Sequence, residues 1–477
     1  MNRFSRRAFI QNTVLSVTAI GWSPRSWAQA AGANNDIRVA VVGFGGRGKS
    51  HIGAFNAMAG VRVVALCDVD ENILRREAEQ LAKQNRRVEA STDIRKLLEN
   101  KNVDAISTAT PNHWHSLVTV WSCQAGKDVY VEKPVSHNVW EGRQCVEAAR
   151  KYNRIVQAGT QSRSSEALRE AFAWVRAGNL GKIKVSRGLC YKRRTSIGKV
   201  DGPQPIPAGI DYDLWCGPAP KGPLMRKKLH YDWHWVWPTG NGDLGNQGIH
   251  QMDTARWALG KMSLSPKVYS VGGRLGYIDD GETANTQMVV HDYGDALLIF
   301  EVRGLPEKSG SPAMDKYRGQ GIGHVIECEG GYLTGTTAYN PAGEVIRKFG
   351  ARGERDHLGN FIAAVRSRKK EDLNADILEG HLSSALCHTG NISYRLGREA
   401  DPDQLVEMLK SDAAAQETLA RMETHLAANG VDLRKTKLNI GPILNMDPQT
   451  ERFIDHPKAN ELLTRNYRAP YVVPAKV

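Results

Sequence analysis

The run "VAVVGFGGRGKSH" (39–51) constrains the fold more than any other part of the chain. Its apolar half predicts a buried strand over 37–43, and Gly43, Gly45 and Gly48 follow with GxGxxG spacing at the start of a predicted helix. In such a turn the first glycine permits the tight bend, the second lets a pyrophosphate approach the backbone, and the third allows close packing of helix on strand. The run therefore predicts the opening strand, turn and helix of a dinucleotide-binding α/β domain.

Asp68 supports this prediction, because it ends the next predicted strand (61–68), 20 residues beyond Gly48. A carboxylate at this place accepts hydrogen bonds from ribose hydroxyls and repels a 2′-phosphate, which favours NAD over NADP. Arg47 and Lys49 in the same turn keep NADP open as an alternative.

Alternating strand and helix patterns continue to about residue 160. We expect strands at 37–43, 61–68, 103–110, 127–134 and 154–160, and helices at 70–84, 113–125 and 138–152. This order predicts a doubly wound parallel sheet.

The pattern changes after residue 160. Longer strands are expected at 182–193, 288–294, 296–304 and 324–336, and helices at 355–368, 376–395 and near 402–425. They predict a second domain on an antiparallel or mixed sheet. We therefore divide the chain into a dinucleotide-binding domain (31–160), a second domain (161–400) and a C-terminal extension (401–477).

The first 30 residues are typical of an export signal. Arg3, Arg6 and Arg7 precede an apolar stretch over 8–22, and "AQA" (28–30) has the form of a cleavage site, with the cut expected after Ala30. The pair Arg6-Arg7 resembles a twin-arginine signal, which implies the twin-arginine export machinery as a partner and a periplasmic location. The alternative is an ordinary secretory signal with two chance arginines. No other segment is long and apolar enough to predict stable membrane insertion.

Composition excludes several other classes. The net charge of +13 is spread along the chain, and its densest run, "RSRKK" (366–370), is better explained as a solvated helix end than as a nucleic-acid site. The 7 cysteines contain no CxxC pair, so neither a metal site nor a disulfide framework is expected.

Five stretches together resemble the Gfo/Idh/MocA oxidoreductases, the family of glucose–fructose oxidoreductase and inositol dehydrogenase. They are "TATPNHWH" (108–115), "VYVEKPV" (129–135), "GDLGNQGIHQMDTARWALG" (242–260) and the closing pair "HLGNFIAAVRSR" (357–368) and "GHLSSALCHTGNISYRLGR" (380–398). The resemblance implies a Rossmann domain followed by an α+β domain with an open, mostly antiparallel sheet. It also implies an NAD(P)-linked reaction on a sugar, cyclitol or related polyol, in a homo-oligomer (dimer or tetramer) joined through the open sheet.

The catalytic residues follow from the same resemblance. Lys133, in the EKP motif, matches the family's active-site lysine, and His250 matches its acid–base histidine. The family commonly has an aspartate four residues before that histidine, where this chain has Asn246. Positions 246, 250 and 253 are expected to share one helical face. Asp243 or, with less weight, Asp253 would then supply a carboxylate.

Further residues are expected around the two ligands. The cofactor set comprises Gly43, Gly45, Gly46, Arg47, Gly48, Asp68, Thr110, Asn112, His115, Glu132 and Lys133. The substrate set comprises Gln161, Arg163, Tyr191, Trp235 and His250. Five tryptophans between 215 and 257 are either an aromatic sugar-binding wall or the core side of a strand through "HYDWHWVWPTGNGD" (230–243).

Three functions remain open from the sequence. The leading one is an exported NAD-dependent oxidoreductase acting on a sugar or polyol. The second is a glycoside hydrolase or lyase that oxidises, eliminates, hydrates and re-reduces one substrate on bound NAD. The third, a non-catalytic sugar-binding protein, fits poorly with retained Lys133 and His250. Because free NAD is not expected outside the cytoplasm, export predicts a tightly bound cofactor.

Overall fold

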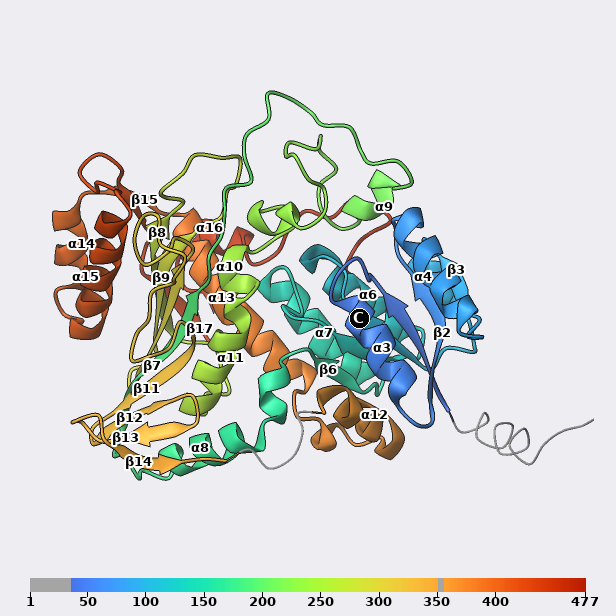
Figure 1. Ribbon diagram of the computed structural model, residues 1–477, viewed down its shortest axis with the longest axis horizontal. Helices are drawn as coiled ribbons and strands as arrows, with labels where there is room; N and C mark the ends of the chain where they lie inside the picture. The colour runs from blue at the N-terminus through green and yellow to red at the C-terminus, as the bar shows by residue number, and fades with distance from the viewer. Residues whose placement is uncertain (1–35, 351–355) are drawn as a thin grey trace, which may run out of the picture.

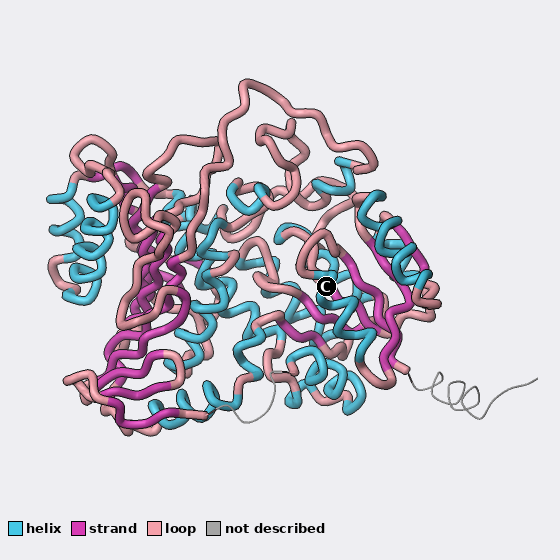
Figure 2. The backbone as a smooth tube through the Cα atoms, in the orientation of Figure 1, coloured by secondary structure: helices cyan, strands magenta, loops and turns pink. Residues whose placement is uncertain are grey.

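The computed structural model describes residues 36–350 and 356–477. The predicted signal segment and its cleavage after Ala30 lie outside the described residues. Two sheets stand beside each other with helices between and around them (Figures 1 and 2). Among the described residues, no helix combines the length and apolar character needed to cross a bilayer.

The first sheet is a parallel Rossmann sheet of six strands in the order β3-β2-β1-β4-β5-β6. Its strands are β1 (Ile37–Val42), β2 (Val61–Cys67), β3 (Glu89–Ser91), β4 (Ala105–Thr108), β5 (Asp128–Val131) and β6 (Val156–Ala158). The five predicted strands are confirmed. β3 was not predicted, because two of its three side chains are exposed and the strand contains no apolar run.

Five helices connect these strands: α3 (Gly48–Ala57), α4 (Glu71–Lys83), α5 (Ile94–Glu99), α6 (Asn112–Gln124) and α7 (Val139–Lys151). The Asp70 side chain caps the start of α4 by accepting hydrogen bonds from the backbone N–H groups of Asn72 and Ile73. The Asn138 side chain caps the start of α7 by accepting one from the backbone N–H of Glu141. Because the strands are parallel, the carboxyl ends of β1, β2, β4 and β5 lie at one edge of the sheet, together with the turns that follow them. Sheets of this kind bind ligands at that edge.

The second sheet has 12 strands, and its main order is β14-β13-β12-β11-β7-β10-β9-β8-β16-β15. The strands are β7 (Ile183–Tyr191), β8 (Lys267–Gly273), β9 (Thr286–Asp292), β10 (Leu297–Arg303), β11 (Ile322–Cys328), β12 (Gly331–Thr334), β13 (Thr337–Tyr339), β14 (Val345–Lys348), β15 (Arg398–Ala400), β16 (Leu438–Ile440), β17 (Leu444–Asp447) and β18 (Arg452–Phe453). Only β7 and β10 pair in parallel within it, so the predicted mixed, mostly antiparallel sheet is confirmed.

Helices cover both faces of this sheet. On the face toward the Rossmann domain lie α11 (Gly248–Leu259) and α13 (Ile377–Arg395), which share a core with Phe300 and Val289. The opposite face carries α14 (Pro402–Leu409) and α15 (Ala413–Ala428) (Figure 1). The single helix expected near 402–425 is two helices. The second begins at Ala413, where the Asp412 side chain caps α15 by accepting a hydrogen bond from the backbone N–H of Ala415.

Residues 192–241 and the last residues of the chain both contact the Rossmann domain. Residues 192–241, between β7 and the short helix α10 (Gly242–Gly245), arch over the Rossmann edge and contain α9 (Tyr212–Cys216) (Figure 1). Within them Asp232–Trp235 forms a 3-10 helix, so the alternative reading of 230–243 as a core strand is wrong. The chain end returns to the Rossmann domain, where Tyr471 and Val473 join the core that contains Trp114.

Candidate functional site

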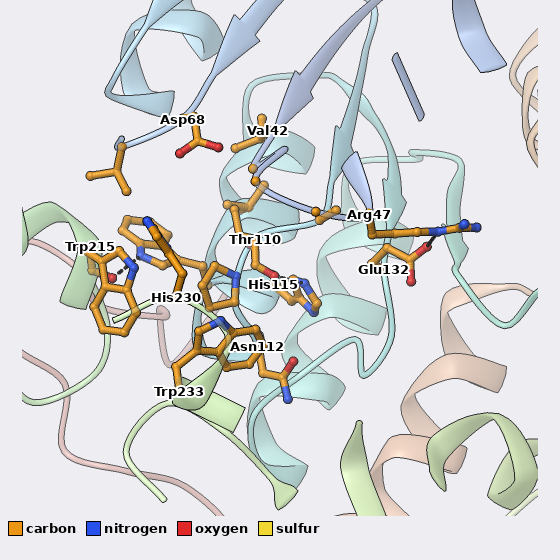
Figure 3. Close-up of a pocket in the computed structure, with 18 of the residues that line it drawn as sticks. Val42, Arg47, Asp68, Thr110, Asn112, His115, Glu132, Trp215, His230 and Trp233 are labelled. Atoms are coloured by element: carbon orange, nitrogen blue, oxygen red, sulfur yellow. Dashed lines mark hydrogen bonds and ion pairs between the residues drawn. The ribbon is translucent and has the colours of Figure 1, made fainter. Parts of the chain in front are cut away.

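A cavity of about 650 Å³ lies at the carboxyl edge of the Rossmann sheet, where residues 192–250 approach it. The glycine turn and Asp68 line it, together with Thr110, Asn112 and His115 at the start of α6 and Glu132 and Lys133 after β5 (Figure 3). Gln161, Asn246 and His250 line the same cavity. Its volume suits a cofactor together with part of a small substrate.

The glycine turn has the shape that a dinucleotide needs. Gly43 has a φ of +74°, and a Cβ there would lie 2.7 Å from the backbone nitrogen of Thr110. A Cβ at Gly48 would lie 2.1 Å from the carbonyl oxygen of Gly43, whereas one at Gly46 would meet nothing within 4 Å. The first and third glycines of the motif are therefore required by packing, and the turn leaves open space before the N-terminus of α3, which favours phosphate.

Asp68 is 9% exposed and is held at the end of β2 by two backbone donors. Its carboxylate accepts hydrogen bonds from Phe44 N (2.9 Å) and Asp70 N (3.0 Å). Burial raises the pKa of this carboxyl, and the two backbone N–H groups oppose that rise. A carboxylate oriented in this way into the cavity fits the ribose hydroxyls of NAD.

Lys133 and Glu132 form the charged centre of the site. The Lys133 ammonium donates to the carbonyl oxygen of Asn246 (3.1 Å), and burial lowers the pKa of that amine. Burial opposes ionisation of Glu132, but the hydrogen bond from His51 and the charges of Lys133 and Arg47 outweigh it and lower its pKa. The Arg47–Glu132 pair (3.2 Å) spans the cavity edge in Figure 3.

His51 was not identified from the sequence. Its ring bridges Glu132 (3.2 Å) and the hydroxyl of Ser107 (2.9 Å) from the middle of α3, and it is fully buried. His51 belongs to no recognisable motif. Only its position on the inner face of α3, eight residues after Gly43, could have suggested its contact with Glu132.

His250 lies in α11 and faces the cavity near Lys133. Burial and the charge of Lys133 lower the pKa of its imidazole to about 3, so the ring is neutral at neutral pH. Asn246 also lines the cavity, but it lies in the break between α10 and α11, with ψ −80°. The expectation that residues 246, 250 and 253 share one continuous helical face is therefore wrong, because the helix is interrupted at 246–247.

The two candidate carboxylates, Asp243 and Asp253, both accept hydrogen bonds from arginine side chains. Asp243 accepts two hydrogen bonds of 2.7 Å from Arg194 and does not line the cavity. Asp253 is fully buried and accepts two hydrogen bonds of 2.9 Å from Arg163. Neither carboxylate lines the cavity, although the charge of Asp243 acts on Lys133, so the catalytic role of Asp243 stays a prediction.

Three of the expected substrate residues are also absent from the described cavity wall. Arg163 is held by Asp253 and Glu379, both at 2.9 Å. Tyr191 is buried, with its hydroxyl on Glu301 (2.7 Å). Trp235 is buried beneath the Arg194 guanidinium, 5.0 Å from its ring centre. None of the three lines the cavity between the described residues, so their contact with substrate stays a prediction without support from this geometry.

The remaining expected residues lie along the cavity with structural partners. Asn112 donates to Asn241 (3.0 Å), and His115 lies 2.6 Å from the carbonyl oxygen of Pro134 and 2.8 Å from that of Thr110. Gln161 donates to Glu132 and to the hydroxyl of Tyr130, both at 3.0 Å. The contact between His115 and Pro134 holds the start of α6 against the turn that carries Lys133.

The aromatic cluster contributes two of the five expected tryptophans to the cavity wall. Trp215, Trp233 and His230 line the cavity opposite the Rossmann edge (Figure 3), as do Tyr231 and His234. Trp215 and Trp233 stood out in the sequence through the density of tryptophans, but His230 carried no signal, because its partner Asp70 lies 160 residues away.

Comparison with known proteins identifies the family of both domains. Residues 37–160 match the model of an oxidoreductase family with an NAD-binding Rossmann fold (GFO_IDH_MocA), and residues 174–301 match the C-terminal alpha/beta domain of that family (GFO_IDH_MocA_C2). Curated relatives include a glycosyl hydrolase family 109 protein 1 of Shewanella sp. (strain ANA-3), 34% identical over 118 residues. That match covers 24% of this chain and 26% of the relative, so the chain spans about a quarter of the relative's length.

Solved structures share the fold. The WlbA dehydrogenase of Bordetella pertussis, in complex with NADH and UDP-GlcNAcA, has a TM-score of 0.55 and 21% identity over 74% of this chain and 94% of that one. GenD2 from gentamicin A biosynthesis, in complex with NAD, has a TM-score of 0.53 and 18% identity over 75% and 93% of the two chains. The two family models together show that this chain belongs to the Gfo/Idh/MocA family, which they describe as an oxidoreductase family with an NAD-binding Rossmann fold.

Proposed function

We propose that this enzyme oxidises a hydroxyl group of a sugar, cyclitol or related polyol with NAD. One observation carries the proposal: a single cavity joins the glycine turn and Asp68 to Lys133 and His250. A substrate hydroxyl bound between Lys133 and His250 would thus lie beside the cofactor end of the same cavity. NAD, when bound, supplies the hydride acceptor.

The two side chains have complementary tasks. The neutral imidazole of His250, whose pKa is lowered to about 3 by burial and by Lys133, has a free lone pair for the hydroxyl proton. The Lys133 ammonium stabilises negative charge that develops on the substrate oxygen. Its bond to the Asn246 carbonyl holds it in place without neutralising it, since a carbonyl carries no full charge.

A second candidate is favoured by the relatives named glycosyl hydrolase family 109, at 34% identity over the matched region. In this cycle a ring hydroxyl is oxidised, which acidifies the neighbouring C–H bond. The glycosidic substituent then leaves, water adds, and the hydride returns, so no net oxidation occurs. The same Lys133 and His250 serve both candidates.

Replacement of the two residues tests the site. We expect Lys133→Ala and His250→Ala each to lower turnover by about 100-fold or more, because each removes a group needed only as charge and protons move. NAD content after denaturation should stay near that of the parent. Lys101→Ala, at an exposed position, is the matched control and should leave turnover unchanged. Full turnover in the His250 variant would remove this residue from the mechanism.

Substrate trials separate the two candidates. Purified enzyme is offered aryl and natural glycosides without added cofactor, and both sugar release and absorbance at 340 nm are followed. Glycoside cleavage without NADH accumulation supports the redox-neutral cycle. A requirement for added NAD or for a second carbonyl compound supports the oxidoreductase.

A further inference from the structure

The segment that arches over the Rossmann edge touches it beside Asp68. We call residues 204–230 the cover segment. Glu71 N donates to the carbonyl oxygen of Gly209 (2.9 Å), and Asn72 Nδ2 donates to that of Ala208 (3.0 Å). His230 Nε2 lies 3.1 Å from Asp70 Oδ2. These contacts place the cover segment at the end of β2, where the adenosine ribose is held in this fold.

The inner side of the cover segment is apolar. Leu214 and Trp215 line the cavity together with Val69 and Ile94 of the Rossmann domain. The carbonyl oxygen of Trp215 lies 3.0 Å from His113 Nε2 and accepts a hydrogen bond from Trp114 Nε1 (3.1 Å), which anchors this part of the segment to α6. A slot with apolar walls beside Asp68 matches a flat adenine ring attached to a ribose.

The chain end lies across the outside of this segment. We call residues 465–473 the C-terminal strap. Arg468 Nη1 pairs with Asp213 (2.8 Å), its Nε donates to the carbonyl oxygen of Ala219 (3.2 Å), and its second terminal nitrogen donates to the carbonyl oxygen of Asp213. One side chain thus holds the residues on both sides of Leu214 and Trp215.

Aromatic residues of the strap anchor it to the Rossmann domain. The hydroxyl of Tyr467 donates to Glu141 of α7 (2.9 Å), and its ring lies 5.8 Å from that of Trp140. Tyr471 is 4% exposed and packs edge-on against Trp114, 5.6 Å between ring centres. The strap is therefore fastened to α6 and α7 while Arg468 reaches the cover segment.

We propose that the cover segment forms the outer wall of the adenosine subsite and that the C-terminal strap holds this wall closed, so that NAD is retained as a resident group. Cofactor exchange then requires the cover segment to leave the Rossmann edge, which is a local opening event whose frequency depends on the contacts of Arg468. The proposal rests on NAD binding and is independent of which substrate the enzyme takes.

Isotope exchange measures this opening directly. The full-length protein with its co-purified NAD is mixed with excess isotopically labelled NAD, and the fraction of labelled cofactor in desalted protein is followed by mass spectrometry. We expect Arg468→Ala to exchange NAD about tenfold faster or more than the parent, because it removes three polar contacts to the cover segment. Arg347→Ala, which breaks an exposed ion pair with Glu170 on the distant sheet edge, is the matched control and should exchange at the parent's rate.

A milder variant guards against loss of folding in Arg468→Ala. Asp213→Asn keeps the size of the partner but removes its charge, and we expect an increase of a few fold in exchange rate with an unchanged melting temperature. The proposal would be overturned if both Asp213→Asn and Arg468→Ala exchanged NAD at the parent's rate. It would also be overturned if Arg468→Ala did not fold and Asp213→Asn exchanged NAD at the parent's rate. A parent that loses all NAD on simple desalting would overturn it as well, whatever its activity with added NAD and substrate.

Discussion

At the scale of single residues, we expect Asp68 to determine the preference for NAD over NADP. Its two backbone donors leave the remaining lone pairs for the ribose hydroxyls. We expect Asp68→Ala to weaken NAD binding by about 1–3 kcal/mol, the cost of leaving polar partners unmatched. NADP binding should change less or improve, since the variant no longer repels the 2′-phosphate. Titration calorimetry on cofactor-stripped protein checks this; an equal loss for both cofactors contradicts the assignment.

The protonation state of His250 makes a second prediction. A base works only when it is unprotonated, and burial together with Lys133 lowers the pKa of His250 to about 3. Activity governed by this base is therefore retained as the pH falls below 6.5, and the acid limb of kcat/KM should lie below about pH 5. A pH–rate profile of the parent shows where this limb lies. A limb near 6.5 that disappears in His250→Ala would show that the imidazole is solvated in the working enzyme.

Asn246 offers a companion test of the same electrostatics. Asn246→Asp would add a carboxylate to the cavity that holds Lys133 and His250. A nearby negative charge favours the imidazolium, so the acid limb should move to higher pH. Profiles of the variant and the parent are compared under identical salt. An unchanged limb would show that position 246 does not influence the base.

At the scale of secondary-structure elements, α14 and α15 occupy a sheet face that the family resemblance had suggested for oligomerisation. Leu419 and Met422 of α15 share a buried core with Val290 and Ile299. Arg421 reaches over the same face to pair with the buried Glu301 (2.8 Å). The helices of the extension therefore cover this part of the sheet.

The packing of α15 can be measured by truncating one side chain. We expect Leu419→Ala to lower the free energy of unfolding by about 2–5 kcal/mol, because it leaves a cavity between α15 and the sheet. Thr424→Ala, at an exposed position on the same helix, should change it by less than about 0.5 kcal/mol. Urea denaturation compares the two. Similar small changes in both variants would mean that α15 is not firmly docked.

At the scale of the whole molecule, the N-terminal arginine pair and the enclosed cofactor site make one hypothesis: the enzyme folds around NAD and is exported in that state. We expect the double change Arg6→Lys and Arg7→Lys to keep the protein in the cytoplasm of a Gram-negative host, because the twin-arginine signal depends on this pair. Cell fractionation, with mass spectrometry of the N-terminus for a cut after Ala30, measures the outcome.

A host strain without the twin-arginine translocase is the control for this experiment, since it should retain the parent protein as well. Exported parent protein should contain NAD when it is denatured. Export of the double variant at the parent's level, or export of protein without NAD, contradicts the hypothesis.

The sequence by itself determined the Rossmann half and the centre of the site. The requirements at these positions are local. Gly43 must adopt a positive φ, a Cβ at Gly48 would clash with a carbonyl oxygen, and Lys133 follows the end of a strand. Local requirements of this kind are visible as residue spacing along the chain. The predicted strands contain the observed β1, β2, β4, β5 and β6, but the last three are shorter than predicted.

Tertiary structure decided which polar residues face the cavity. Arg163 was expected to contact substrate, but it pairs with Asp253 and Glu379 inside the fold. Asp243 likewise pairs with Arg194. The contacts of His230 and Arg468 with distant segments likewise have no sequence signature. The physical reason is that a charged side chain takes whichever partner the packed elements bring near it, and that partner can lie hundreds of residues away.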